Sequence, residues 1–202
     1  LIDLGRLQEA EISTRQAIKL NPDFAMAHYN LGIILRDLGN LQEAEISYRK
    51  AIQIDPLYAD AHSNLGNILK DLGNLQDAEL FTRKAIELNP NYAEAHSNLG
   101  TILRDLGNLQ EAESSTRKAI ELNPNLGEAY FILGNILKAN SKLDEALYNL
   151  KKAQENKMDS NKCLAGIGKV LLAQGKHNQG IRNLREAEGS IIFDLKNGLS
   201  KI

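Results

Sequence analysis

A regular repeat runs through almost the whole chain and constrains its fold more than any other feature. The glycines that mark its step are Gly32, Gly66, Gly100, Gly134 and Gly168. The prolines from Pro22 to Pro124 keep the same step, and segment 93–126 repeats segment 59–92 almost letter for letter. A fixed period of this length is typical of repeat architectures, in which each unit covers the apolar face of its neighbour.

Within one repeat, two stretches with helical spacing flank a short turn. In segment 59–92, Leu65 and Leu69 belong to the apolar side of a predicted first helix. Gly73 is expected to take the left-handed turn that ends this helix. Asn74 is expected to cap the second helix, with Asp77 as its partner three positions later. The same cap pattern occurs at Asn40 with Glu43 and at Asn108 with Glu111.

The period predicts how the chain is divided into units. Residues 1–10 match residues 35–44, which lie inside a repeat, so we expect this sequence to be a piece of a longer protein. The predicted units are a partial repeat over 1–24 (second helix only), full repeats over 25–58, 59–92 and 93–126, degenerate repeats over 127–160 and 161–194, and a C-terminal cap or linker over 195–202. In the degenerate repeats, Ser141 replaces the turn glycine and Met158 replaces the proline. Such drift is expected near the end of a stack.

Charge and composition exclude several functions. A net charge of −2 creates no field that would favour nucleic acid, and no apolar run is long enough to span a membrane. Cys163 is the only cysteine, so no internal disulfide forms. His28, His62 and His96 lie on successive repeats, too far apart to share a metal, and packing is their expected role. We therefore expect no metal, no cofactor and no enzymatic activity.

The pattern of large and small residues resembles a known family. In segment 59–92 it reads His62, Leu65-Gly66, Leu69, Ala78, Thr82, Ala85 and Pro90. This spacing is similar to the tetratricopeptide repeat, a helix–turn–helix unit with the same period. The resemblance implies an all-α solenoid of stacked helix pairs, wound into a right-handed superhelix. It also implies that the first helices line a concave groove, whose usual role is to hold a peptide or a partner protein.

The resemblance also indicates which positions face that groove: the second, fifth, sixth, ninth and twelfth of each repeat, with Ala59 counted as position one. The sixth positions are Asn30, Asn64 and Asn98. This row resembles the asparagines in the repeat arm of O-linked N-acetylglucosamine transferases, where amides hold a peptide backbone. An amide both donates and accepts hydrogen bonds, as a peptide backbone does. Alternatively, these asparagines tie neighbouring helices together or face water.

Other candidate binding residues follow from the same positions. The fifth positions contribute Tyr29 and Phe131, the ninth Asn67, Thr101 and Asn135, and the twelfth the cations Arg36, Lys70, Arg104 and Lys138. Cations in a groove would favour an acidic or C-terminal segment. Aspartate follows the first three cations and could neutralise them, and a cation in the last turn of a helix also complements its dipole.

The sequence therefore predicts a non-catalytic interaction module that binds an extended peptide or partner protein. The alternative is the substrate-recognition arm of a larger enzyme whose catalytic domain lies outside this segment. Self-association through the terminal repeats is a further possibility, because an unmatched repeat leaves an apolar face uncovered. A cytoplasmic location is expected, and a pentatricopeptide-like array that binds nucleic acid is disfavoured by the step of 34 rather than 35.

Overall fold

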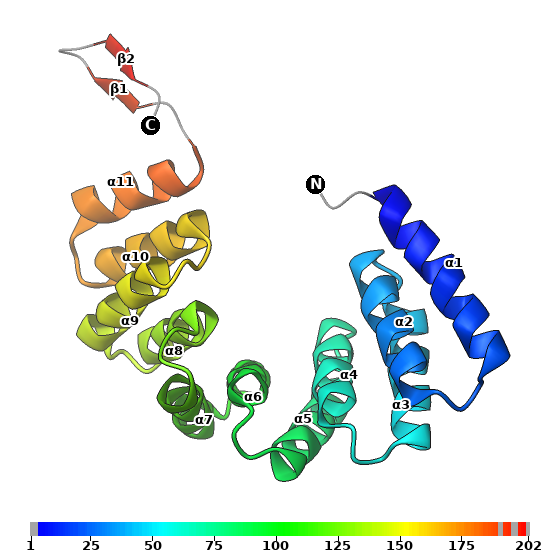
Figure 1. Ribbon diagram of the computed structural model, residues 1–202. Helices are drawn as coiled ribbons and strands as arrows, with labels where there is room; N and C mark the ends of the chain where they lie inside the picture. Colours follow the sequence, from blue (N-terminus) through cyan, green and yellow to red (C-terminus); the bar gives the residue numbers. More distant parts are fainter. Residues whose placement is uncertain (1–3, 190–191, 195–197, 201–202) are drawn as a thin grey trace. The chain divides into compact units, whose positions relative to one another are not determined.

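The computed structural model describes residues 4–189, 192–194 and 198–200, and it consists of consecutive helical hairpins (Figure 1). The helices are α1 (Leu4–Leu20), α2 (Ala25–Asp37), α3 (Leu41–Ile54), α4 (Ala59–Asp71), α5 (Leu75–Leu88), α6 (Ala93–Asp105), α7 (Leu109–Leu122), α8 (Gly127–Ala139), α9 (Leu143–Glu155), α10 (Ser160–Ala173) and α11 (His177–Ala187). Even-numbered helices are the first helices of the repeats, and odd-numbered helices are the second.

The chain divides into two compact units, Leu1–Ile102 and Leu103–Ile202, and each is described by itself. In the first unit, each of the helices α1 to α4 packs on the one that follows it. In the second unit, α7 to α11 pack in the same consecutive way, and the first helices α8 and α10 also touch. Each unit is therefore built by stacking one hairpin on the next.

The predicted apolar sides of the helices form the core. Leu65 on α4 is fully buried and Leu69 is 2% exposed. The alanines Ala78 and Ala85 on α5 are fully buried opposite them. The glycines at position eight allow the two helices of a hairpin to come close: a Cβ atom on Gly32 would lie 2.6 Å from the ring of Tyr48, and one on Gly66 would overlap Thr82 Oγ1. The helical spacing in the sequence therefore predicted the core correctly.

The turns follow the predictions in part. Gly73 has the expected positive φ of +84°, and Ser141 keeps the left-handed conformation (φ +59°) without a glycine. Asn74 caps α5 as predicted, because its oxygen accepts a hydrogen bond from the Asp77 N–H at 3.4 Å. The predicted caps at Asn40 and Asn108 are wrong, since neither side chain makes a cap hydrogen bond.

The difference between these caps lies in the acidic residue. The Asp77 carboxylate accepts from Asn74 Nδ2 at 2.8 Å, which turns the amide oxygen toward the helix. At Asn40 the corresponding acid is Glu43, and Arg15 holds its carboxylate at 2.7 Å instead. Beside Asn40, the acid thus pairs with a cation of another helix and not with the capping amide.

The recurring histidines have a more specific role than packing alone. The Nε2 atoms of His28, His62 and His96 lie 2.9–3.0 Å from the backbone oxygens of the prolines six residues earlier in each case. A carbonyl oxygen only accepts, so Nε2 carries the proton in each ring. Burial, the largest influence on His62, lowers its pKa and favours the neutral ring. The histidines therefore fasten each first helix to the turn before it.

A short pair of strands follows the helical repeats. Strands β1 (Ile192–Asp194) and β2 (Gly198–Ser200) pair in antiparallel fashion, with Phe193 opposite Leu199. Of the predicted cap or linker over 195–202, residues 195–197 and 201–202 lie outside the described residues.

Candidate functional site

We define the first-helix face of each unit by the fifth, sixth, ninth and twelfth positions of its first helices. In the first unit these positions hold Tyr29, Asn30, Ile33, Arg36, Ser63, Asn64, Asn67, Lys70, Ser97, Asn98 and Thr101. Exposure on this face differs with the size of the side chain. The small fifth-position residues Ser63 and Ser97 are only 1% and 2% exposed. The predicted binding residues around them are half-buried, and Asn30 is exposed. Side chains on this face are therefore held in place while part of each remains accessible.

The asparagines at position six connect neighbouring first helices. Asn64 Nδ2 on α4 donates to Tyr29 Oη on α2 at 3.1 Å. Asn98 Nδ2 on α6 donates to Ser63 Oγ on α4 at 3.4 Å. The tie between helices, which the sequence left open as an alternative, is thus formed at both positions. Among the described residues, neither amide oxygen has a hydrogen-bond donor, so each amide keeps free binding capacity.

Tyrosines surround the first of these ties. The rings of Tyr29 and Tyr58 lie 4.8 Å apart at 35°, and those of Tyr29 and Tyr48 lie 5.9 Å apart. Burial, followed by a hydrogen bond with Asp60, raises the pKa of Tyr92, so its phenol stays neutral at physiological pH. This cluster presents aromatic surface next to the hydrogen-bonding groups of Asn64.

Three members of this cluster were not predicted from the sequence: Tyr58, Tyr92 and Asp60. A signal for the two tyrosines exists, because the last position of three successive repeats is aromatic (Phe24, Tyr58 and Tyr92). Asp60 occupies the second position, which the resemblance had marked as facing the groove. The two tyrosines lie in the turns between repeats, yet stacking brings them against the first helices.

The predicted cations of the twelfth positions fall into two groups. Arg36, Lys70 and Arg104 pair with the aspartates that follow them, at 2.8, 3.1 and 2.7 Å. The expected neutralisation by Asp37, Asp71 and Asp105 is therefore confirmed. Lys138 is followed by Ala139, and among the described residues it has no acidic partner.

Lys138 belongs to a group of cations in the second unit. Burial comes first among the causes that lower its pKa, followed by the charges of Lys169 and Arg104. Lys169, at the ninth position of the last repeat, was not predicted, because that repeat is degenerate. The Asn135 amide donates to Phe131 O at 3.1 Å within α8, so it is held by its own helix and not by a neighbouring first helix. This part of the face is positively charged and only partly neutralised.

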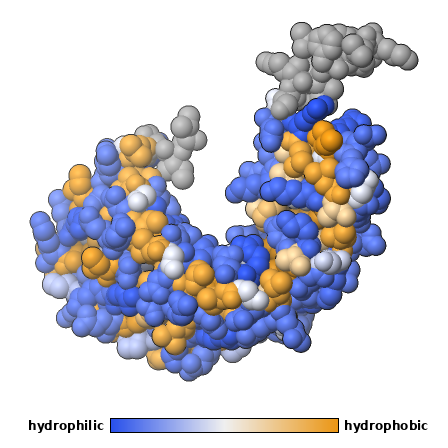
Figure 2. Space-filling model, turned by 180° about the vertical axis from the view of Figure 1, so that it is seen from behind, coloured by the Kyte–Doolittle hydropathy of each residue, from blue (hydrophilic) through white to orange (hydrophobic). Residues whose placement is uncertain are grey.

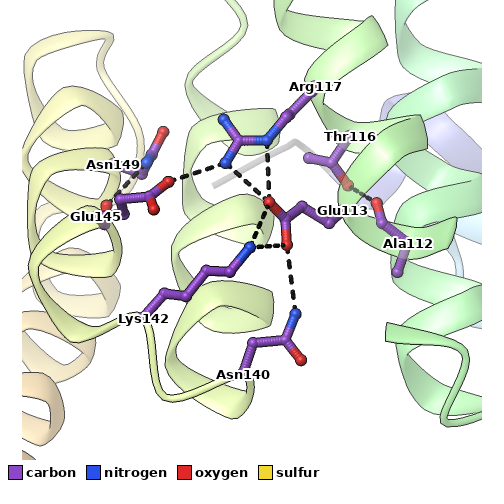
Figure 3. A network of polar contacts seen from close by, with 8 residues as sticks. All are labelled: Ala112, Glu113, Thr116, Arg117, Asn140, Lys142, Glu145 and Asn149. Carbon is purple, nitrogen blue, oxygen red and sulfur yellow. Dashed lines mark hydrogen bonds and ion pairs between the residues drawn. The ribbon is translucent and has the colours of Figure 1, made fainter. Parts of the chain in front are cut away.

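A separate polar network joins the second helices of the second unit (Figure 3). Glu113 on α7 accepts from Arg117 at 2.8 Å and from Lys142 at 3.0 Å, and Arg117 also reaches Glu145 on α9 at 2.9 Å. Burial of Glu113 opposes its ionisation, but the hydrogen bonds from Arg117 and Lys142 prevail and lower its pKa. The network spans from α7 to the first turn of α9, so it strengthens the contact between repeats.

Other kinds of site find little support in the described ranges. No group of three or more His, Cys, Asp or Glu side chains there could hold a metal ion. No helix within those ranges combines the length and apolar composition needed to cross a bilayer. On the face shown in Figure 2, hydrophobic side chains appear on both units among hydrophilic ones. The amide and aromatic groups of the first-helix face are therefore the candidate site.

Stacked helical hairpins that recur at one fixed step of the sequence define a helical repeat solenoid. Models of the tetratricopeptide repeat match residues 1–59, 59–92, 93–126 and 116–148. The chain therefore belongs to the tetratricopeptide-repeat family, as the resemblance indicated. No curated protein matches the sequence.

Solved structures share the fold. The chain is 25% identical to YrrB, described as a tetratricopeptide-repeat protein with an unusual peptide-binding site, over 86% of this chain and 90% of YrrB, with a TM-score of 0.65. It is 25% identical to MamA over 78% of this chain and 92% of that one, with a TM-score of 0.65. The pilus biogenesis factor PilW is 23% identical and has a TM-score of 0.80 over 88% of this chain and 82% of its own, which shows the fold alone.

Proposed function

We propose that this protein is a non-catalytic interaction module that holds an extended peptide of a partner protein along its first-helix face. The observation that carries the proposal is the tie made by Asn64 and Asn98 to the preceding first helix. Each amide is fixed by one of its hydrogens, while its oxygen has no donor among the described residues. A fixed group with free hydrogen-bonding capacity is the arrangement that binding sites require.

The chemistry of an amide suits a peptide backbone. Its oxygen accepts from a backbone N–H, and its remaining hydrogen donates to a backbone C=O. Helices pack about 8–10 Å apart and an extended chain advances about 3.3 Å per residue. Asparagines on consecutive first helices are thus spaced to meet roughly every third residue of the peptide. Tyr29 and Tyr58 add aromatic surface for its side chains.

The peptide-binding site described for YrrB supports this proposal by likeness of fold and family. The row Asn30, Asn64 and Asn98 further resembles the repeat arm of O-linked N-acetylglucosamine transferases. We extend the proposal: the amides of these asparagines hold the peptide backbone, as amides do in that repeat arm. Binding then depends on the peptide backbone more than on its side chains. A recognition arm of a larger enzyme would use the same face. A cytoplasmic location and self-association through the terminal repeats stay predictions.

Changing Asn64 and Asn98 together to alanine is expected to weaken peptide binding at least about tenfold, because each lost hydrogen bond contributes about 0.5–1.5 kcal/mol. Peptides selected from a random display library against the wild-type protein would serve as ligands, with affinities measured by calorimetry.

The matched control changes Asn91 and Asn125, which lie exposed in the turns between repeats, to alanine. This control should bind as the wild type does. Equal affinity of the Asn64/Asn98 variant, with helicity retained in circular dichroism, would contradict the proposed role of the amides.

The cation group of the second unit leads to a separate prediction. Lys138→Gln is expected to weaken binding of acidic peptides and to raise the free energy of unfolding by about 0.5 kcal/mol. The protonated form of Lys138 is disfavoured in the folded state, so its pKa is lowered from the ordinary 10.5. Between the lowered pKa of the folded state and the ordinary pKa of the unfolded state, the unfolded chain binds more protons than the folded chain. Lys138 therefore makes the free energy of unfolding rise with pH across that window.

Urea denaturation at several pH values measures this effect, and Lys151→Gln, an exposed lysine of α9, is the control. The pH-dependent rise should be smaller in Lys138→Gln than in the control. A loss of stability at neutral pH would show that Lys138 contributes packing and not repulsion.

A further inference from the structure

The first unit carries a cavity of about 400 Å³ between α1 and α3, which are the second helices of their repeats. Ile18 of α1, Leu31 of α2 and Ile46 of α3 supply its apolar lining. Its remaining lining residues are Arg15, Lys19, His28, Ser47 and Lys50. None of these residues belongs to the first-helix face as defined above.

The equivalent place one repeat later is occupied by the protein itself. Between α3 and α5, the ring of Phe81 stacks on the ring of His62, with centroids 5.9 Å apart at 29°. The guanidinium of Arg49 covers the same ring at 5.2 Å from its centroid. Phe81 thus contacts both an imidazole and a guanidinium, and both contacts are favourable for an aromatic ring.

The cavity has the walls of this slot without its occupant. His28 and Arg15 stand one repeat before His62 and Arg49, and both line the cavity. Ser47 stands one repeat before Phe81, so a hydroxymethyl group replaces the ring. The Ser47 hydroxyl donates to Glu43 O at 2.9 Å within its own helix and does not fill the space.

The rim of the cavity is basic. Among the described residues, Lys19 and Lys50 have no ion pair, although Lys50 contacts the side chain of Gln53 at 3.2 Å. Arg15 is paired with Glu11 and Glu43, at 2.8 and 2.7 Å. The two lysines leave positive charge beside an apolar slot. An occupant with negative charge next to its aromatic ring would complement both features.

We propose that the cavity between α1 and α3 is a second binding site, which takes an aromatic side chain flanked by acidic residues from a partner protein. The ring would stack on His28 beneath Arg15, as Phe81 does on His62 beneath Arg49. Lys19 and Lys50 would contact the acidic flanks. The site lies apart from the asparagines at position six, so it can act together with the first-helix face on one partner.

The test uses a blocked pentapeptide with phenylalanine at its centre and two acidic residues on each side. Protein-observed NMR is expected to show binding with a Kd of about 1 mM or tighter, with the His28 ring signals shifted by the stacked aromatic ring. Ser47→Phe fills the slot from within, and we expect it to weaken binding at least about tenfold. A peptide with serine at its centre should bind at least about tenfold more weakly to the wild type.

Ser13→Phe is the matched control, because Ser13 occupies the same repeat position on α1 and its hydroxyl makes the same contact, to Glu9 O at 2.9 Å. It should bind the peptide as the wild type does. The Asn64/Asn98 alanine variant should also bind normally, which separates this site from the first-helix face. Phe81→Ser should open a second slot that binds the acidic peptide more weakly, because Gln53 and a Lys84 paired with Glu87 stand there in place of Lys19 and Lys50.

Unchanged affinity in a folded Ser47→Phe variant would overturn the proposal, as would equal binding of the serine-centred peptide or no binding to the wild type. If the wild type instead self-associates in sedimentation and Ser47→Phe abolishes this, the occupant is a second copy of the chain and the acidic partner is wrong.

Discussion

Gly127→Ala is expected to lower the free energy of unfolding by about 2–3 kcal/mol, an overpacking effect, although the three preceding repeats carry alanine at this position. A Cβ atom on Gly127 would lie 2.5 Å from Asn156 O and 3.2 Å from Ala153 O. Both are backbone atoms, so a side chain cannot rotate away to make room. The end of α9 would have to move.

The reason lies in the way this repeat ends. Earlier repeats end their second helix before a proline, whereas Met158 stands at that place here. The Asn156 N–H still bonds to Lys152 O at 3.0 Å, and Lys157 turns into the left-handed region at φ +63°. This ending comes one residue earlier than in α3, α5 and α7, and it places the Asn156 carbonyl against the first residue of α8. The missing methyl group at Gly127 and the changed ending therefore belong together.

Urea denaturation, followed by a probe in the second unit, measures this loss of stability. The control is Ala59→Gly, which makes the opposite substitution at the same repeat position. It removes the methyl group where a proline ending leaves room for it, and its expected cost is at most about 1 kcal/mol. If Gly127→Ala proved as stable as the wild type, the ending of α9 would have to be more adaptable than its packing indicates.

Leu150→Ala is expected to lower the free energy of unfolding by about 3–4 kcal/mol, the range for a large cavity in a core. Leu150 is fully buried in a cluster with Leu133, Leu137, Ile167 and Val170. Cβ atoms on Gly134 of α8 and Gly166 of α10 would lie 2.7 and 3.0 Å from its side chain. Leu150 thus packs between two glycines on successive first helices. Glycines offer no side chain that could close the cavity left by the change.

Because repeats are stabilised by their neighbours, the loss should spread along the stack. We expect amide hydrogen exchange to accelerate in α8, α9 and α10 and to stay unchanged in α2 and α3 of the first unit. Leu80→Ala is the control, since Leu80 is 63% exposed and its loss should change stability little. Faster exchange confined to α9 would contradict the coupling between repeats.

The candidate site could be predicted only in part. The row of asparagines was found from its regular step and the family resemblance, and so were the cations of the twelfth positions. The hydrogen bond between Asn64 and Tyr29 joins side chains on different repeats, and no periodic pattern shows such a partner. Asp60 and Tyr92 stand at opposite ends of one repeat, 59–92, and no local pattern shows that their side chains form a hydrogen bond. Lys169 was not predicted, because the last repeat has lost the residue pattern from which the groove-facing positions are counted.

The cavity between α1 and α3 illustrates the same division. The sequence shows that Ser47 and Phe81 occupy the same position of successive repeats, one with a small side chain and one with an aromatic ring. Only packing shows that Phe81 contacts a histidine and an arginine, and that a cavity remains at the equivalent place beside Ser47. Whether a small residue creates a cavity depends on how far its neighbours are from one another, and helix packing decides that distance.

By itself the sequence determined the family, the helix–turn–helix unit, the buried positions and most of the turns. These are local properties: helical spacing, glycine conformation and the exclusion of proline from helices act over a few residues and recur at every repeat. Only the tertiary structure decided which amides are tied to which hydroxyls, which cations keep their charge and where a slot stays open. Those outcomes depend on contacts between repeats, and a contact between side chains one repeat apart is set by the stacking of helices that no local pattern encodes.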